Sequence, residues 1–313
     1  MHDEVALNLA PPTDLSSGSD SPRAPGPLAA WRQALCCADA LAACALFALL
    51  EAVPPLCFAQ HTRQPPYQTV ADGAPGAEAV LVRAGFINQP YVAPSAQACP
   101  AAWLIAICAL VPLGVWLALS LAAPARGAVK GYALGYAHAM MLARLVVNST
   151  KRYVGYWRPY FYDECDFADD APYDCDHSAR GDDMYKSFPS GHAAMSMCAL
   201  LHTSWVLLGR ARLAESARGA GCRPCAKAAA RAADDDEARR RVLDPTSFKI
   251  AACLCPAFLA WWIAASRVYD NDHHPADVVG GAVIGGSFAS LFYFRHFPSI
   301  FAMDAHVPWG YGG

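Results

Sequence analysis

The stretch Arg267–Asp277, which reads R-V-Y-D-N-D-H-H-P-A-D, is a charged segment with two adjacent histidines between two apolar runs. So many ionisable side chains between segments of membrane length are costly unless they lie at a membrane surface or face a polar cavity. A helix that starts at Pro275 would place His273 and Asp277, four residues apart, near one face. A carboxylate placed there orients an imidazole and favours its protonated form. The stretch therefore predicts a polar functional site, and it leaves open whether His273 or His274 carries the chemistry.

The composition around this stretch indicates a membrane protein. The chain has 313 residues, of which 55% are hydrophobic and 16% are charged. Average proteins carry about 25% charged residues, so the low charge argues against a large soluble enzyme. The net charge of −3, without a basic stripe interleaved with aromatic residues, argues against nucleic acid as a partner.

Six apolar runs have close to the ~20 residues that a helix needs to cross a bilayer. The third run carries the polar residues His138 and Arg144, and the fourth is short. The fold class that these runs predict is all-α, an integral membrane bundle of six transmembrane helices. We place the spans at Ala30–Val53, Ala102–Ala123, Val129–Asn148, Ala193–Leu208, Phe248–Ser266 and Val278–Phe297.

The loops between the spans predict an orientation. The link that contains Arg126 and Lys130 and the Arg-rich loop 209–247 belong in the cytoplasm by the positive-inside rule. The three remaining loops then face the cell exterior or an organelle lumen. The predicted organisation is a disordered cytoplasmic tail without a signal peptide at 1–28, a six-span domain at 29–298 with the loop 209–247 inserted, and a short C-terminal tail at 299–313.

Thirteen cysteines are scattered along the chain. Cys57 and Cys99 flank one predicted extracytoplasmic loop, and Cys165 and Cys175 flank another, so disulfides are compatible with the sequence while their connectivity stays open. Cys222-x-x-Cys225 is half of a zinc-binding pattern without a second pair nearby, and we do not interpret it as a metal site.

The last predicted span contains two pairs of glycines, Gly280-Gly281 and Gly285-Gly286. Small residues spaced four apart allow two helices to approach closely, so we interpret these glycines as packing residues. A nucleotide-binding loop would need a strand before the glycines, and the sequence does not predict one there.

Two more polar clusters precede the opening stretch in the chain. Lys151 and Arg158 are seven residues apart, two helical turns, and they offer a phosphate a point charge and a planar fork. A basic girdle at the end of a membrane helix is the alternative interpretation. The second cluster, Ser187–His192, combines hydroxyls, a glycine amide and a histidine at the start of the fourth span, where a helix N-terminus favours anions. Its alternative is a turn with a capping serine.

The predicted topology places all three clusters on the non-cytoplasmic side of the membrane. Together they resemble the type 2 phosphatidic acid phosphatase family, the lipid phosphate phosphatases, whose pattern is K-x6-R-P, then P-S-G-H, then S-R-x5-H-x3-D. Tyr160, after the first motif, and Pro275-Ala276, within the third, lie outside the pattern positions. The acidic run Asp163–Asp183 has no role that the family assigns. The pattern positions here are Lys151…Arg158-Pro159, Pro189-Ser190-Gly191-His192 and Ser266-Arg267…His273…Asp277.

The resemblance implies hydrolysis of a lipid phosphomonoester through a phosphohistidine, without a metal or another cofactor. Phosphatidic acid, lysophosphatidic acid and sphingolipid phosphates are the substrates that it implies. The implied catalytic residues are His273 as nucleophile, His192 as general acid and base, and Asp277 as the carboxylate that orients the nucleophile. The implied phosphate-binding residues are Lys151, Arg158, Ser190, Gly191 and Arg267.

The implied partners are a lipid phosphate and the bilayer, in the plasma membrane or an endomembrane, with the active site extracellular or luminal. Homo-oligomerisation is left open. A phosphatase of polyprenyl or diacylglycerol pyrophosphates would show the same pattern. A non-catalytic scaffold would be expected to have lost key polar residues, which this chain retains. Vanadate-dependent haloperoxidases share the pattern but are not six-span lipid-facing proteins.

Overall fold

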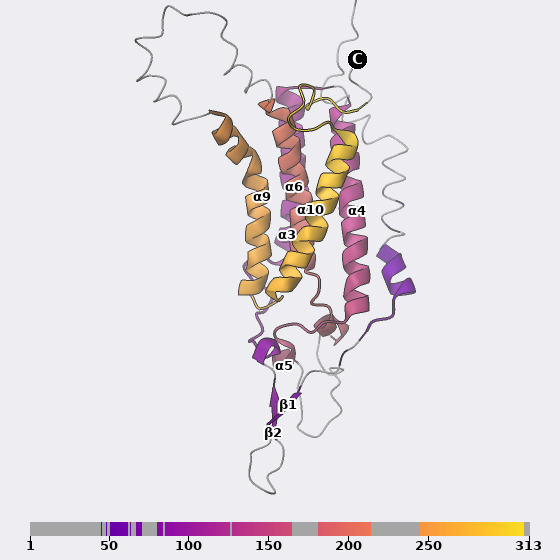
Figure 1. Ribbon diagram of the computed structural model, residues 1–313, viewed down its shortest axis with the longest axis vertical. Coiled ribbons are helices and arrows are strands. Elements are labelled where there is room, and N and C mark those ends of the chain that lie inside the picture. The colour runs from indigo at the N-terminus through magenta and orange to yellow at the C-terminus, as the bar shows by residue number, and fades with distance from the viewer. Residues whose placement is uncertain are drawn as a thin grey trace, which may run out of the picture.

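Long helices run side by side in a bundle (Figure 1). The computed structural model describes residues 45, 48, 51–61, 63, 67–70, 80–83, 85–125, 127–164, 181–213 and 245–309. Its long helices are α3 (Ala101–Ala122), α4 (Ala128–Val154), α6 (Gly191–Arg210), α9 (Pro245–Tyr269) and α10 (Pro275–His296). Its short elements are β1 (Tyr67–Val70), β2 (Val80–Arg83), η1 (Gly85–Ile87), α5 (Phe161–Glu164) and η2 (Gly181–Tyr185).

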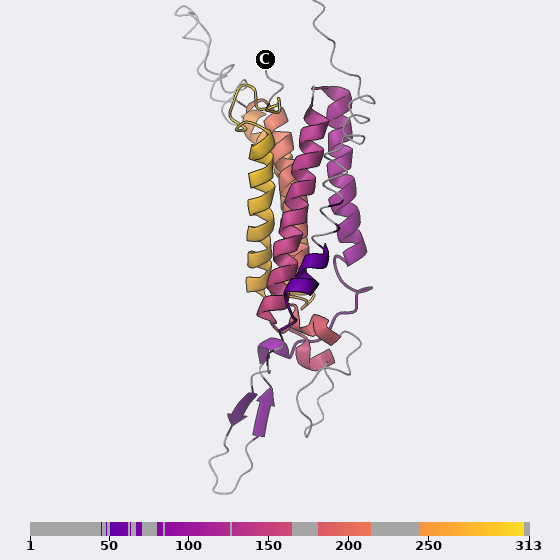
Figure 2. The same ribbon diagram turned by 90° about the vertical axis from the view of Figure 1, so that its right-hand side faces the viewer.

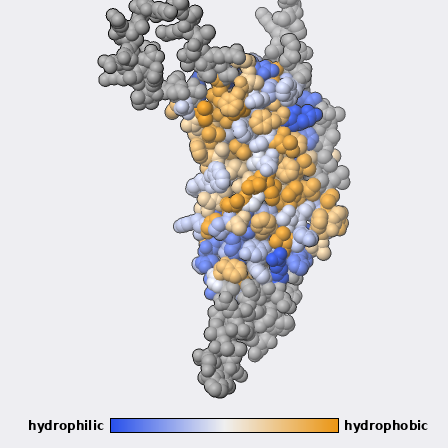
Figure 3. All heavy atoms as spheres, in the orientation of Figure 1, coloured by the Kyte–Doolittle hydropathy of each residue, from blue (hydrophilic) through white to orange (hydrophobic). Residues whose placement is uncertain are grey.

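Three of these helices are long and apolar enough to cross a membrane: α3, residues Ser247–Tyr269 of α9, and α10. Large apolar side chains such as Trp103, Leu110 and Trp261 point outward from them and are more than half exposed. Figure 3 shows apolar residues spread over the outer face along the helices. A surface of this kind fits lipid rather than water, so the protein is an integral membrane protein.

The helices α4 and α6 are comparable in length but less apolar. Lys130, His138 and Arg144 interrupt the apolar sequence of α4, and polar side chains such as His202 and Thr203 are buried inside the bundle in α6. The first predicted span, Ala30–Val53, lies mostly outside the described residues. The described part of the structure thus supports a helical membrane bundle with three apolar spans.

The helix α6 lies at the centre of the bundle, where it packs against α3, α4, α9 and α10. Small residues permit this crowded position: Ala193, Ala194 and Ala199 of α6 are fully buried. Two glycines allow α10 to approach most closely. A Cβ atom at Gly281 would lie 2.3 Å from the carbonyl oxygen of Ser190, and one at Gly285 would lie 2.1 Å from that of Ala194.

The two glycine pairs are therefore not equivalent. Gly281 and Gly285 face the backbone of α6, as predicted for packing residues. A Cβ atom at Gly280 would meet the ring of Phe188 at 2.8 Å, whereas one at Gly286 would make ordinary contacts with Leu201 and Met197 at 3.6 and 3.7 Å. Close helix contact thus accounts for one member of each pair.

The loops that carry the three polar clusters meet at one end of the bundle, and Figure 2 shows β1 and β2 beyond that same end. The helix α4 extends past its predicted end at Asn148 to Val154, and Gly155 ends it in the left-handed conformation with φ of 59°. His274 caps α10, and Pro275 occupies its first turn. The main-chain N–H of Ser190 donates to the carbonyl of Asp277 over 2.9 Å, which joins the starts of α6 and α10.

The antiparallel pair of β1 and β2 was not predicted from the sequence. The two segments, YQTV and VLVR, are short and rich in residues that favour strands, and they lie within the long loop between the first two predicted spans. Cys57 and Cys99, considered above for a disulfide, are free thiols, the first exposed and the second buried. Cys165, Cys175, Cys222 and Cys225 lie outside the described residues.

Candidate active site

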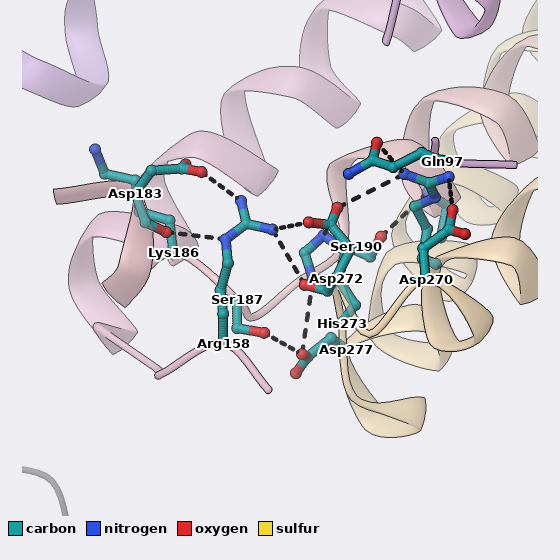
Figure 4. Close-up of polar contacts among 12 residues, drawn as sticks. Gln97, Arg158, Asp183, Lys186, Ser187, Ser190, Asp270, Asp272, His273 and Asp277 are labelled. Carbon is teal, nitrogen blue, oxygen red and sulfur yellow. Dashed lines mark hydrogen bonds and ion pairs between the residues drawn. The ribbon is translucent and has the colours of Figure 1, made fainter. Parts of the chain in front are cut away.

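The three motifs converge at the end of the bundle where α4 ends and α6 and α10 begin. Figure 4 shows Arg158, Ser187, Ser190, His273 and Asp277 gathered around one polar centre. They come from segments that lie up to 119 positions apart in the sequence, the interval from Arg158 to Asp277. Helix packing therefore brings the residues of the three motifs together, as the predicted topology of the motifs suggested.

Arg158 lies in the loop after α4, is 7% exposed, and donates hydrogen bonds from all three guanidinium nitrogens. Its Nε donates to the carbonyl of Asp183 over 3.0 Å, and its Nη2 donates to the carboxylate of Asp183 over 2.9 Å. Its Nη1 donates to both the carbonyl and the carboxylate of Asp272, over 3.1 and 3.0 Å. Burial alone would lower the pKa of Arg158, but the two carboxylates outweigh it and raise the pKa, so the side chain stays charged.

Arg267, at the end of α9, is completely buried. Its Nε and Nη2 donate to the Ser266 hydroxyl over 3.2 and 3.1 Å, and its Nη2 also donates to the Asp270 carboxylate over 2.6 Å. Its Nη1 donates to the side-chain oxygen of Gln97 over 3.2 Å. The Asp270 carboxylate in turn accepts the main-chain N–H of Ala98. A buried cation is tolerated here because each side of its fork has an acceptor.

Asp272 lies between the two arginines. Its Oδ1 accepts from Arg158 and, over 3.3 Å, from the hydroxyl of Tyr160. Its Oδ2 lies 3.7 Å from Nη1 of Arg267 and 3.8 Å from Nε2 of His273. Burial would raise the pKa of Asp272, but the surrounding positive groups, led by Arg158, outweigh it and lower the pKa below its usual range. The carboxylate is therefore ionised at neutral pH.

His273 is 3% exposed and stands between two carboxylates. Its Nδ1 lies 3.7 Å from Oδ2 of Asp277, an ion-pair distance but too long for a hydrogen bond. Its Nε2 points to Asp272. Burial lowers the pKa of His273 to about 4; Asp277 and Asp272 oppose that shift, and Arg158 and Lys151 add to it. The imidazole is therefore neutral at physiological pH: Asp277 favours its protonated form, as predicted from the sequence, but burial outweighs this effect.

Asp277 is fully buried in the first turn of α10, and one of its oxygens makes most of its contacts. Oδ2 accepts from the Ser187 hydroxyl over 2.6 Å and from the main-chain N–H of His274 over 2.9 Å. It lies 3.2 Å from Nδ1 of His274, closer than the 3.7 Å to His273. The ring of His274 also contacts the carbonyl of Phe86. His274 thus bonds locally and caps α10, while Oδ1 of Asp277 has no hydrogen-bond partner among the described residues.

Lys151 and the start of α6 complete the group. The Lys151 ammonium donates to the carbonyl of Lys186, and its Cε lies 3.9 Å from where a Cβ atom at Gly191 would be. The Ser190 side chain accepts the N–H of Ala193 and caps α6, which is the alternative considered for it above. Lys151 lies within electrostatic range of Arg158, Asp272 and Asp277.

His192 sits in the first turn of α6, near the same centre. It lies within electrostatic range of Arg267, Asp272 and His273. Its Nε2 has no hydrogen-bond partner among the described residues. The structure thus brings all eight residues selected from the sequence to one end of the bundle, and His192 holds an uncommitted nitrogen there.

The motifs alone did not select the acidic and polar residues that hold the two arginines. Asp183 closes the acidic run that had no assigned role, Asp270 and Asp272 lie within the opening stretch, and Gln97 comes from the loop before α3. Asp270 and Asp272 could have been identified from the sequence, because they lie inside the third motif. No local sequence pattern identifies Asp183 and Gln97, because their contacts with the arginines span 25 and 170 residues. In the described part of the chain, no three His, Cys, Asp or Glu side chains are grouped to hold a metal ion.

Comparisons with known proteins agree with this arrangement. The family model described as the PAP2 superfamily matches residues 132–300, more than half of the chain and all three motifs. No solved structure matches the chain significantly.

Among curated proteins, the chain is 27% identical over 188 residues to "Probable lipid phosphate phosphatase 4" of Arabidopsis thaliana, which covers 57% of this chain and 52% of the relative. It is 25% identical over 184 residues to "Probable diacylglycerol pyrophosphate phosphatase 1" of Schizosaccharomyces pombe, with 56% of each covered. A "PA-phosphatase related-family protein" of Dictyostelium discoideum is 28% identical over 122 residues, with 39% of this chain and 35% of the relative covered. The matches thus span between about a third and just over half of these relatives. The chain belongs to the PAP2 superfamily and, within it, to the type 2 phosphatidic acid phosphatase family.

Proposed function

We propose that the protein is a lipid phosphate phosphatase that hydrolyses phosphomonoesters such as phosphatidic acid, lysophosphatidic acid or sphingolipid phosphates through a phosphohistidine intermediate. The observation that carries the proposal is a buried His273 whose Nε2 lies 3.8 Å from the Asp272 carboxylate, which is shared by two buried arginines, Arg158 and Arg267. A neutral imidazole has a free lone pair, and the arginines would stabilise the charge of the phosphoryl group in transfer.

The phosphate would be held by the cationic side chains and by donors at the start of α6. Arg158 and Arg267 offer planar forks that match phosphate oxygens, and Lys151 offers a point charge. The Ser190 hydroxyl and the Gly191 amide lie at a helix N-terminus, where an anion is favoured. Together these groups would spread the charge that develops on the three non-bridging oxygens.

In the first step, Nε2 of His273 would attack phosphorus and form a P–N bond while the ester P–O bond breaks. Asp277 would face the proton on Nδ1 and stabilise the positive charge that the ring acquires. His192, which must enter this step as the imidazolium, would give the proton of its otherwise uncommitted Nε2 to the departing alkoxide. The lipid alcohol would leave, and the phosphoryl group would stay on His273.

In the second step, His192 would take a proton from a water molecule that attacks the phosphohistidine. The P–N bond breaks, inorganic phosphate forms, and His273 returns to its neutral state. The sum of the two steps is the hydrolysis of one phosphomonoester bond, with no redox change and with the proton on His192 restored.

We propose that this reaction takes place in the membrane topology predicted from the sequence. Residues 29–298 would form a six-span domain with the Arg-rich loop 209–247 on the cytoplasmic side, and the site would face the exterior or a lumen. The acyl chains of the substrate would stay in the outer leaflet while the headgroup enters the site from the side. The apolar outer faces of α3, α9 and α10 support this picture.

The test measures phosphate release from phosphatidic acid by the purified protein in mixed micelles that contain EDTA. We expect turnover in EDTA and its fall by about 10³-fold or more in His273→Ala, because no other group supplies the nucleophile. Normal turnover in His273→Ala would show that the nucleophile is another residue.

Two further histidine variants serve as controls in this assay. His61→Ala removes an exposed histidine at the same end of the molecule and should leave turnover unchanged. His274→Ala should keep most of it, because the main-chain N–H of residue 274 still donates to Asp277. Loss of activity in His274→Ala with activity retained in His273→Ala would reverse the assignment of the two histidines.

Pyrophosphate hydrolysis is the second candidate, because relatives from Schizosaccharomyces pombe and Saccharomyces cerevisiae are named as diacylglycerol pyrophosphate phosphatases. The same site chemistry would cleave a P–O–P bond. A panel of phosphatidic acid, diacylglycerol pyrophosphate and a polyprenyl pyrophosphate, compared by kcat/KM in one detergent, separates the two candidates.

A further inference from the structure

One carboxylate stands where two buried arginines and the proposed nucleophile meet. Asp272 is 6% exposed; its Oδ1 accepts from Arg158 over 3.0 Å, and its Oδ2 lies 3.7 Å from Arg267 and 3.8 Å from Nε2 of His273. Figure 4 shows Asp272 in this central position, between Arg158 on one side and the group around Asp270 on the other.

The groups around Asp272 are those that the proposed function assigns to the phosphate. A guanidinium fork binds a carboxylate and a phosphate with the same donor geometry. For Nε2 of His273 to reach phosphorus, the phosphoryl group must stand before that nitrogen, on the side where the Asp272 carboxylate now lies. The carboxylate and a bound phosphate therefore compete for the same place.

Charge leads to the same conclusion. Arg158 is also held by Asp183 and Arg267 by Asp270, so three carboxylates serve two guanidinium groups. Asp183 and Asp270 each serve a single arginine, and Asp272 is the carboxylate that the two share. A phosphate that entered beside an ionised Asp272 would bring like charges within about 4 Å of each other, and their repulsion is only weakly screened at a partly buried site.

The main chain of Asp272 is fixed, so the competition concerns its side chain. Its N–H donates to the carbonyl of Arg267 over 2.9 Å, and its carbonyl accepts from Arg158 over 3.1 Å. A rotation of the side chain would take the carboxylate away from the arginines without moving the loop. Asn271, in the left-handed conformation with φ of 54°, fixes the turn next to it.

We propose that Asp272 is an internal competitor of the substrate phosphate, which occupies the phosphate pocket of the empty protein and must turn away for the headgroup to bind. The proposal rests on the proposed function, because it takes the pocket between Arg158 and Arg267 as the phosphate site. A ligand must therefore bind the two arginines more strongly than Asp272 does. A doubly charged phosphomonoester displaces the singly charged carboxylate more readily than a singly charged phosphodiester does.

The test measures the binding of inorganic phosphate to the purified full chain by titration calorimetry, and its effect on Tm. In Asp272→Asn, which keeps the shape of the side chain and removes its charge, we expect the Kd of phosphate to fall about tenfold or more. Phosphate should also raise the Tm of this variant more than that of the wild type, because a ligand that binds the folded state more tightly stabilises it more. Asp272→Ala should also lower the Kd of phosphate. This second variant is needed because an asparagine side chain at position 272 could stay hydrogen-bonded to Arg158.

The matched control is Asp182→Asn, which makes the same change of charge on an exposed side chain that lies 3.9 Å from the ammonium of Lys186. Its affinity for phosphate should stay within about twofold of wild type. A structural role of Asp272 predicts the opposite result, since a damaged pocket binds phosphate less well. Equal or weaker phosphate binding in both Asp272 variants would overturn the proposal.

Binding and turnover separate this inference from the proposed function. A wild-type protein that hydrolyses no lipid phosphate or pyrophosphate, while Asp272→Asn binds phosphate more tightly, would reject the proposed function and leave the inference in place. Turnover of phosphatidic acid with unchanged phosphate affinity in Asp272→Asn and Asp272→Ala would reject the inference alone.

Discussion

At the scale of single residues, the site is built from charges that burial would penalise if they stood alone. Arg267 has no exposed surface, yet Ser266, Gln97 and Asp270 accept from its guanidinium group. Breaking a buried pair by removing one partner typically costs about 3–5 kcal/mol, because the remaining charge has no compensation. The acidic partners therefore fix the arginines in position, and the histidine between them can remain neutral.

The neutrality of His273 leads to a prediction about pH. With a pKa of about 4, the ring stays mostly neutral down to about pH 5, whereas a histidine with the ordinary pKa of ~6.5 would be only about 3% neutral there. Because the nucleophile must be neutral, kcat/KM should not fall with a midpoint near pH 6.5 as the pH decreases from 7 to 5. The measurement is the pH profile of kcat/KM for phosphatidic acid.

The substrate titrates in the same range, so its own pKa is measured by ³¹P NMR in the same micelles and its contribution to the profile is removed. An acid limb near pH 6.5 that remains after this correction would contradict the assignment of a buried, neutral His273 as the nucleophile.

At the scale of helices, the site depends on how closely α10 lies against α6. The hydrogen bond from Ser190 to the carbonyl of Asp277 joins the first turns of the two helices, and Gly281 and Gly285 continue the contact along α10. Within a bilayer, packing of this kind supplies much of the association between helices, because lipid is as apolar as the side chains. A shift of α10 would move Asp277 and His273 relative to Ser190.

We therefore expect Gly285→Ala to destabilise the protein by about 1–3 kcal/mol, because the new methyl group would meet the backbone of Ala194 at 2.1 Å. Thermal unfolding in detergent should show a Tm lowered by several degrees. Gly286→Ala is the matched control on the same helix, since its nearest contacts at 3.6 and 3.7 Å are ordinary van der Waals distances. Equal Tm values for the two variants would mean that α10 does not lie against α6 as described.

At the scale of the whole molecule, the polar site lies at one end of an apolar bundle. Tyr153 is exposed near the end of α4 on the side of the site, and Phe301 is exposed after α10 at the other end. If the site faces the exterior or a lumen, a probe that does not cross membranes should distinguish these two ends.

We expect Tyr153→Cys to be labelled by a membrane-impermeant maleimide in intact cells more strongly than the wild type. If the protein lies in an endomembrane, the same experiment uses sealed vesicles whose luminal side faces outward. Phe301→Cys should add labelling only after permeabilisation. The wild-type signal, which includes native thiols such as the exposed Cys57, is subtracted. Labelling of Phe301→Cys before permeabilisation, without labelling of Tyr153→Cys, would place the site in the cytoplasm.

The match of the three motifs to the family pattern was enough to select the eight candidate residues, because each motif is local and its helix starts and ends are encoded nearby. Gly155, Ser190 and Pro275 mark such helix boundaries in the sequence. The apolar spans α3, α9 and α10 were predicted to within about three residues at each end, because length and hydrophobicity define them. The end of α4 was predicted too early, because Lys151 and Arg152 continue the helix beyond its apolar part.

By itself, then, the sequence determined the helical membrane architecture and the three motifs, since these depend on hydrophobicity and short-range spacing, and the resemblance of the motifs to the family pattern selected His273 over His274 as the proposed nucleophile. Only the tertiary structure decided what surrounds the motifs. Asp183, Asp272 and Gln97 hold the arginines through contacts between separate segments, and burial makes His273 neutral. Such long-range contacts and burial arise when the helices pack together, and no local pattern records them.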